Sequence, residues 1–417
     1  MTCRQLVSLW MIACAASGCG ITVTWRAPDT PTPQNAWSIL VTPSVEELSR
    51  HLQRVGIPDI PMRTHVRPCC AFGHGLKARL GALPIPGLRI GNIKLIDEIG
   101  PHRYDSGLLM VGDDQGQGGL FSDEHNGLVF TCRGGFIDTA HVRDHADWTI
   151  FLAARLFPHL ETGITLELPN EGGRRRIAVR PVDPTLLASH ERVALALSIA
   201  GWLSFQLSVW HEIATWYGWS WSPSFPEKDS AFSPEDLYSN LVGIKIATAI
   251  ALERSARSAS LYDRSVDAWM REVVRALGPT SKATALEAMD ALDGVWWNSR
   301  TRLPDPAAIL RRNFSTGPTI TPWLVPESLQ SDPLRADLAK ECGGQPVPLP
   351  LPNVTSFSGV EIATIARLEI ELDGGLAHEL PLSAFGAKLD QSDFLQIVAV
   401  IEKENRELFG PHANRPD

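Results

Sequence analysis

Two histidines with helical spacing are the first residues whose types and positions could do chemistry. His141 and His145 stand four residues apart in a polar segment that begins at Asp138. Side chains at positions i and i+4 of an α-helix lie on one face, so two imidazoles with this spacing can bind one transition metal ion. The same spacing also arises by chance on a solvated helix face, and that interpretation stays open.

A third histidine and a carboxylate follow a long apolar stretch. His211 and Glu212 come directly after Val193–Trp210, a segment without charge, so both side chains are expected at a buried helix end. Burying an ionised carboxylate without a partner is costly, and a metal ion or a cationic side chain would offset that cost. The string from His211 to Thr215 is similar to the HExxH motif of zinc proteases, with Thr215 in place of the second histidine. That family's ligand set is therefore not carried over whole.

Together these residues predict a catalytic zinc centre. His141, His145 and His211 would supply three imidazole ligands and leave a fourth position for water, as in catalytic zinc sites. Glu212 is expected to take a proton from the metal-bound water. A salt-bridged helix end is the structural alternative for His211 and Glu212.

Glu235 and Asp236 open the next predicted helix, with Ser233 as its expected N-cap. Carboxylates in a first helical turn stabilise the helix dipole, which is the structural interpretation of this pair. The functional interpretation makes one of them a fourth metal ligand or a second base, with Glu235 as the alternative to Glu212.

Aromatic side chains and a loop histidine suggest a substrate-binding surface. Trp216 and Trp219 follow His211 at the predicted helix end, where aromatic rings could line a cleft for a sugar, a peptide or an acyl chain. His74 lies in a glycine-rich loop, a location that often carries binding residues. Core packing is the structural alternative for the tryptophans.

The hydrophobic pattern predicts a mainly α-helical α+β protein, with a buried central helix and small antiparallel β elements. The central helix is expected at 184–217, and a hairpin at 164–168 and 175–180 carries the basic run Arg174–Arg176, interpreted as a solvated face. A membrane span is the alternative for the central helix, but its serines and a glutamine favour a core helix. Further helices are expected at 45–55, 138–156, 233–257, 265–277, 282–292 and 391–409, and strands at 88–99, 108–111, 128–131 and 367–372.

The first residues predict export and lipidation. Arg4 precedes a short apolar run that ends in small residues directly before Cys19, the layout of a lipoprotein signal peptide. The expected organisation is a signal peptide at 1–18, lipidation at Cys19, a tether at 19–42, a main domain at 43–345 and a small α/β tail at 346–417. Gly20, rather than Asp, follows the cysteine and points to the outer membrane.

Charge and cysteine content narrow the partners. The chain carries 38 basic and 47 acidic residues, a formal charge of −9, which argues against nucleic acid as a partner. Outside the signal peptide and Cys19 four cysteines remain, which allow three pairings in an oxidising compartment. The expected pairing joins one of the first two to Cys132, since a vicinal disulfide would be strained. The four are Cys69, Cys70, Cys132 and Cys342.

Three segments, Arg67–Gly73, Asn126–Asp144 and Ser233–Asn240, resemble a family of bacterial envelope lipoproteins classed as a domain of unknown function. The resemblance covers most of residues 60–330 and implies no settled activity.

Two functions follow as hypotheses. The first is a zinc-dependent hydrolase of peptide, amide or ester bonds in a wall or lipid component of the cell envelope, lipid-anchored and facing the periplasm. The second is a lipoprotein without catalytic activity that binds a wall or protein partner through the aromatic region around Trp216 and Trp219.

Overall fold

The computed structural model shows a mainly α-helical α+β protein. The predicted signal peptide, Cys19 and Cys70 lie outside the residues that it describes. These are 31–51, 60–67, 69, 73–80, 83–90, 92–109, 124–189, 192–220, 227–253, 258–351, 357–380 and 385–417.

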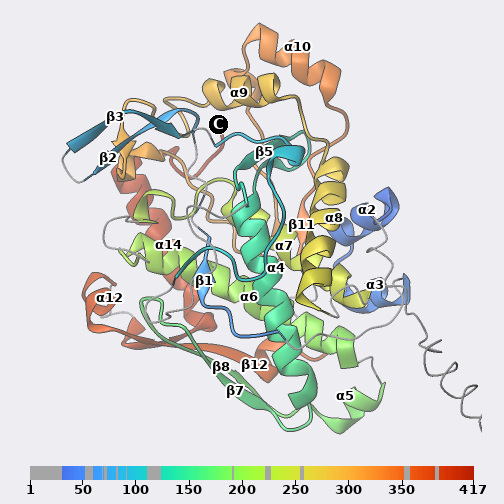
Figure 1. Cartoon of the computed structure of the whole chain (residues 1–417). Helices are drawn as coiled ribbons and strands as arrows, with labels where there is room; N and C mark the ends of the chain where they lie inside the picture. The colour runs from blue at the N-terminus through green and yellow to red at the C-terminus, as the bar shows by residue number, and fades with distance from the viewer. Residues whose placement is uncertain are drawn as a thin grey trace, which may run out of the picture.

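Three helices that pack against one another form the centre: α4 (Thr139–Leu156), α6 (Arg192–Trp216) and α7 (Asp236–Leu252) (Figure 1). Every residue of α7 and nearly every residue of α6 is buried, so neither helix has a solvent-exposed face. By length and composition α6 could cross a membrane, but its apolar stretch is buried inside the protein, which confirms the predicted core helix. The helix predicted at 184–217 corresponds to α5 (Pro184–Ser189) and α6, with residues 190 and 191 between them outside the described residues.

The backbones of α4 and α7 touch at Gly243. A Cβ atom at this position would lie 2.0 Å from the carbonyl oxygen of Val142, a distance that only glycine allows. One turn earlier on α7, Asn240 therefore meets His141 of α4.

The start of α7 differs from its prediction by two residues. Ser233 is not the N-cap, because the helix begins at Asp236 and Glu235 occupies the cap position without a side-chain cap hydrogen bond. Instead the Ser233 hydroxyl donates to Glu235 Oε1 at 2.7 Å, and its N–H donates to Asp236 Oδ2 at 2.8 Å. Hydrogen bonds from Ser233 thus orient both carboxylates at the start of the helix.

A four-stranded antiparallel sheet covers one side of the helices and lies at the bottom of Figure 1. The predicted hairpin is present, and the strand from the C-terminal segment pairs with it along its full length, while α14 (Gln391–Phe409) packs against α6. The segment predicted as a small α/β tail, 346–417, thus contributes a strand to the sheet of the main fold. In spatial order the strands are β13 (Lys388–Asp390), β12 (Ala366–Leu372), β8 (Gly173–Val179) and β7 (Ile164–Leu168).

The predicted tether is partly wrong. Within it, α2 (Pro33–Val41) is capped by the Thr32 side chain and buries Ala36, Ile39 and Leu40. The helix packs against α7 and α8 (Ala259–Leu277), because its apolar face is large enough to join the core. Helix α3 (Val45–His51) follows, and the remainder of the helix predicted at 45–55 lies outside the described residues. Both helices lie beside α8 in Figure 1.

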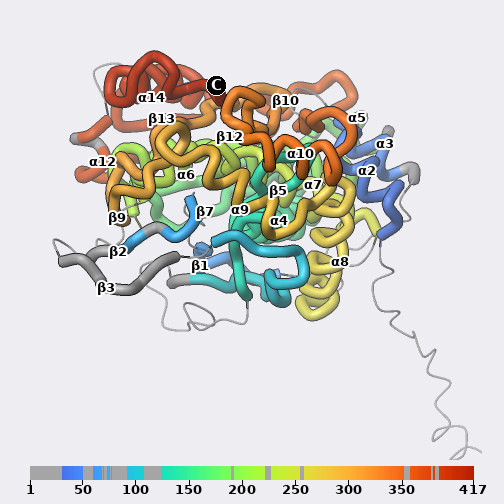
Figure 2. The backbone as a smooth tube through the Cα atoms, turned by 90° about the horizontal axis from the view of Figure 1, so that it is seen from above, coloured from blue at the N-terminus to red at the C-terminus, as the bar shows by residue number. Residues whose placement is uncertain are grey.

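Short elements complete the fold and surround the central helices (Figure 2). The strand predicted at 88–99 is wrong over most of its length, because β3 ends at Ile90 and Ile96–Glu98 form a short 3-10 helix. Strand β3 pairs antiparallel with β2. The remaining elements are β1 (His65–Val66), β2 (Leu76–Leu80), β3 (Leu83–Ile90), β4 (Leu108–Leu109), β5 (Leu128–Thr131), β6 (Gly135–Asp138), β9 (Arg302–Leu303), β10 (Thr319–Ile320), β11 (Leu349–Pro350), α9 (Lys282–Ala291), α10 (Asp332–Glu341), α11 (Ile362–Ile365) and α12 (Gly374–Glu379).

Cys132 and Cys342 form a disulfide that links the turn after β5 to the end of α10. The predicted pairing of Cys132 with Cys69 or Cys70 is wrong, because the fold brings the distant Cys342 to Cys132 with a Cα–Cα separation of 5.3 Å. Cys69 is not disulfide-bonded.

Peptide mapping of the oxidised protein under non-reducing conditions should recover Cys132 joined to Cys342. Replacing both cysteines by serine should lower the free energy of unfolding by about 2–5 kcal/mol, because the bond restrains a long loop in the unfolded chain. Urea denaturation of the two forms measures the difference. A peptide linking Cys132 to Cys69 or Cys70 would contradict the assignment.

Candidate functional site

The site begins at the N-terminus of α4. Asp138 caps this helix through Oδ1, which accepts hydrogen bonds from the N–H of Ala140 at 2.7 Å and of His141 at 3.4 Å. Its other oxygen, Oδ2, lies 3.8 Å from Cys69 Sγ and 3.9 Å from His141 Nε2. One fully buried carboxylate therefore caps the helix and offers an oxygen to the site.

Asn240 fixes the orientation of the His141 ring. His141 Nδ1 lies 3.0 Å from Asn240 Oδ1, so the proton is assigned to Nδ1, which donates to the amide oxygen. His141 Nε2 then faces Asp236 Oδ1 at 3.5 Å. A hydrogen bond at one ring nitrogen that presents the other nitrogen is the usual arrangement of a metal-binding histidine.

Two overlapping groups of side chains bring their ligand atoms together. Cys69, His141 and Asp236 form the first, with all three ligand atoms within 4.8 Å of one another. Cys69 also belongs to the second, with Asp138 and Glu235, at the same spacing. Zinc bonds of about 2.0–2.3 Å in a tetrahedron place ligand atoms about 3.3–3.8 Å apart. The 3.5, 3.8 and 3.9 Å separations given above are close to these values.

The acidic side chains of the site are buried and incompletely bonded. Glu212, Glu235 and Asp236 are each exposed by 3% or less. Among the described residues, one oxygen of each has no hydrogen-bond partner: Glu212 Oε1, Glu235 Oε2 and Asp236 Oδ1. Buried polar atoms without partners are rare because each costs about 1–3 kcal/mol, so these three oxygens are candidates to accept a further hydrogen bond or to hold a cation.

The pKa shifts of the buried side chains also indicate an excess of negative charge at the site. Burial, together with the negative charges of Asp236 and Asp138, raises the pKa of Glu235 well above its usual range. Burial and the charge of Glu212 raise the pKa of Asp236 in the same direction. Two opposing effects act on the pKa of His141. Burial alone would lower it, but the negative charges of Asp236 and Asp138 raise it to about 9. The buried acids and His141 thus form an environment that stabilises a positive charge.

A network of buried ion pairs holds Cys69 against α4. The nearby Arg67 donates to Glu124 at 2.8 Å, to Asp147 at 2.9 Å and to Asp144 at 2.6 Å. Asp144 also accepts a hydrogen bond from Arg63 at 2.7 Å. Because Arg67 is two residues from Cys69, this network fixes the segment that carries the thiol.

The three predicted zinc ligands line one cavity of about 40 Å³, together with Cys69. However, His145 and His211 are not in the convergent groups, so the predicted three-histidine ligand set is corrected to one built around His141. His145 Nδ1 lies 3.1 Å from Ser204 Oγ, and burial with the nearby charge of His141 lowers its pKa well below the usual range. His211 Nδ1 lies 2.5 Å from Glu171 Oε1.

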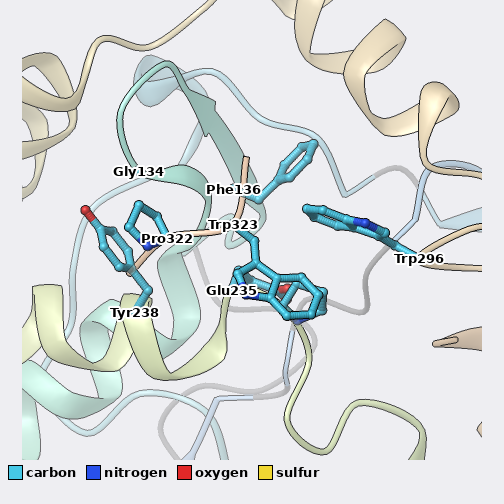
Figure 3. Close-up of a pocket in the computed structure, with 8 residues that line it drawn as sticks. Gly134, Phe136, Glu235, Tyr238, Trp296, Pro322 and Trp323 are labelled. Carbon is cyan, nitrogen blue, oxygen red and sulfur yellow. The ribbon is translucent and has the colours of Figure 1, made fainter. Parts of the chain in front are cut away.

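The predicted bases both lie at this site. Glu212 accepts a hydrogen bond from the N–H of Phe232, which leaves Oε1 without a partner among the described residues. Glu235 also lines a second, narrow pocket with aromatic walls (Figure 3). Besides Glu235, residues lining that pocket include Phe136, Tyr238, Trp296 and Trp323.

The predicted binding residues have other environments. Trp216 is 2% exposed and donates from Nε1 to Glu404 at 2.9 Å, so it packs α6 against α14 and lines no cleft. Trp219 is half-buried, with its ring 5.8 Å from that of His211. His74 is half-buried and does not line the cavity described above. Trp216 is therefore not accessible to a partner, whereas Trp219 keeps part of its ring surface exposed.

The sequence interpretation considered Cys69 for a disulfide and named neither Asn240 nor Asp138 as a ligand. An aspartate directly before a helix and three residues before a histidine is a usable indication, because the cap position and the first turn share a face. Cys69 and Asn240 have no comparable local pattern.

The chain belongs to a family of proteins of unknown function, DUF4056, which matches residues 57–326. All residues of the two convergent groups, and Asn240, lie inside the matched segment. No curated protein and no solved structure matches the chain.

Glu235→Gln should stabilise the metal-free protein at pH 7 by roughly 1 kcal/mol, because it removes a carboxylate whose ionisation is opposed by burial and by two neighbouring acids. The folded-state pKa is raised, so the wild type binds more protons folded than unfolded and loses stability as pH rises above about 4.5. Chelator-treated samples melted between pH 5 and 8 test both points.

The exposed Glu379 provides the matched control. Glu379→Gln should leave the melting temperature and its pH dependence unchanged. Equal effects of the two substitutions would contradict the charge balance described for the site.

Proposed function

We propose that the chain is an exported envelope lipoprotein whose main domain is a zinc-dependent hydrolase of peptide, amide or ester bonds. The observation that carries the hydrolase proposal is the convergence of Cys69, His141 and Asp236, which share the site with buried carboxylate oxygens that lack partners.

The donor set favours zinc over the hard cations. Thiolate and imidazole are ligands of zinc and of other late first-row metals, whereas magnesium and calcium prefer oxygen alone. Cys69 and His141 supply the soft and borderline donors, and Asp236 or Asp138 supplies oxygen. Asn240 would hold the His141 ring in the required tautomer.

The remaining acids have roles in the chemistry. Zinc in a site of this kind lowers the pKa of bound water and polarises the carbonyl of a substrate. Glu212, with Oε1 buried and without a partner, is positioned near the group to accept a proton. Glu235 is the alternative base, or a further ligand through its convergence with Cys69 and Asp138.

A cysteine hydrolase is the second candidate. Its support is the placement of the His141 ring between Cys69 and Asn240, an order of groups that also suits a thiol nucleophile. The surrounding carboxylates oppose it, because negative charges beside Cys69 disfavour a thiolate unless a cation is bound. For this reason we place the metal first.

Elemental mass spectrometry of protein starting at Gly20, purified without a His tag, should find about one zinc per chain. His141→Asn should remove the metal with little change of fold, since the amide keeps a polar group in place of the ring. Calorimetric titration of chelator-treated protein with zinc should show the same loss of binding.

His145→Asn is the matched control, because His145 lines the same cavity but lies outside the convergent groups. It should keep the metal. Loss of zinc in both variants would restore the three-histidine set. A metal-free wild type that does not bind zinc, with hydrolytic activity lost in Cys69→Ser, would favour the cysteine hydrolase.

Export and lipidation rest on the first residues of the chain. The Cys132–Cys342 disulfide supports an oxidising compartment, where such bonds persist. Cells grown with an alkyne-tagged fatty acid should label the wild-type protein, while Cys19→Ser should abolish the label and release the protein from membranes. Equal labelling of both would contradict lipidation at Cys19.

A further inference from the structure

We propose that Arg175, supported by His211, forms a carboxylate-binding subsite in the cavity beside the Cys69–His141 group. The binding itself stands on the geometry of Arg175. The consequence for substrate choice rests on the proposed hydrolase function.

The inward position of Arg175 follows from the strand period. Side chains alternate along β8, so Arg174 and Arg176 point outward, where they form ion pairs with Glu371 and Glu369 of β12. Arg175 points inward and is 2% exposed. The basic run interpreted as a solvated face is therefore solvated only at its two outer members.

The guanidinium of Arg175 is only partly bonded. Its Nε donates to the carbonyl of Pro169 at 2.9 Å, and Nη1 donates to Glu171. Its Nη2 is buried and has no hydrogen-bond partner among the described residues. Arg175 also lines the cavity that contains Cys69, so a positively charged hydrogen-bond donor is available in that cavity.

The local charge favours an anion. Glu171 is shared between Arg175 and His211, and its charge raises the pKa of His211 to about 10 although burial alone would lower it. These three side chains therefore carry one net positive charge at neutral pH. Burial raises the pKa of Glu227 to about 7, so this cavity residue can take up a proton when an anion enters.

The other charged residues of the cavity have partners of opposite charge or are neutral. His141 faces Asp236 at 3.5 Å. Arg67 and Asp144 bond to each other, and burial lowers the pKa of His145 well below neutral. An arginine with a free donor recognises a carboxylate through charge-assisted hydrogen bonds, which are the strong ones. The small size of the cavity suits the carboxylate end of a chain rather than a bulky anion.

The position of the subsite determines which bond is cleaved. Cys69 and His141 line the same cavity, so a substrate whose terminal carboxylate is held by Arg175 presents its last amide or ester bond to the convergent group. If the proposed hydrolase function holds, the enzyme removes the C-terminal residue from peptides with a free carboxylate.

The test compares N-acetylalanine with N-acetylalaninamide, which differ only in the carboxylate. Calorimetry with the metal-loaded protein and with the chelator-treated protein should show at least about tenfold tighter binding of the acid, the usual scale of one charge-assisted hydrogen bond. Arg175→Gln should abolish this preference. Arg176→Gln, the outward neighbour, should keep it.

His211→Asn tests the same subsite if Arg175→Gln does not fold, and should reduce the preference several-fold. No preference in the wild type, or an unchanged preference in folded His211→Asn and Arg175→Gln, would overturn the proposal. If the protein binds no zinc but the chelator-treated sample still prefers the acid, the subsite is supported and the proposed metal site is contradicted. Failure of the subsite and failure of the metal site are therefore distinguishable.

Discussion

The balance of buried charge along α4 is the constraint on which the rest of the structure depends. In its middle turns Asp144 and Asp147 are matched by Arg67 and Arg63, and His102 Nε2 lies 3.0 Å from Asp147. Buried ions are tolerated when each has a close partner of opposite charge. This matched network ties residues 60–67 to the helix and places the adjoining thiol at its N-terminus.

At the first turn of α4, the described residues do not balance the buried negative charge with an equal positive charge. Asp138 meets Glu235 and Asp236 from α7, with Glu212 from α6 close by, and His141 is the cation in direct contact with them. A protein selected only for stability would not retain such a group, because each added like charge opposes the others. Unfavourable local chemistry in a well-packed core is typical of a functional site.

Local sequence patterns predicted much of the fold. The apolar period and the capping residues located α4, α9, α14 and the C-terminal end of α6 to within a few residues, and the β7–β8 hairpin followed from its alternation and turn. The errors came from long-range packing. Helix α2 joins the core although it lies in the segment 20–42, which is rich in proline and threonine. Strand β12 pairs with β8, which lies almost 200 residues earlier in the chain.

For the site, the sequence by itself determined that His141 and His145 share one helix face and that Glu212 ends a buried helix, since these follow from period and composition. Only the tertiary structure decided which residues meet. Gly243 lets α7 approach α4 closely enough for Asn240 to orient His141, and the ion-pair network brings Cys69 beside Asp138. Contacts between segments distant in sequence depend on how whole elements pack, and no local spacing encodes them.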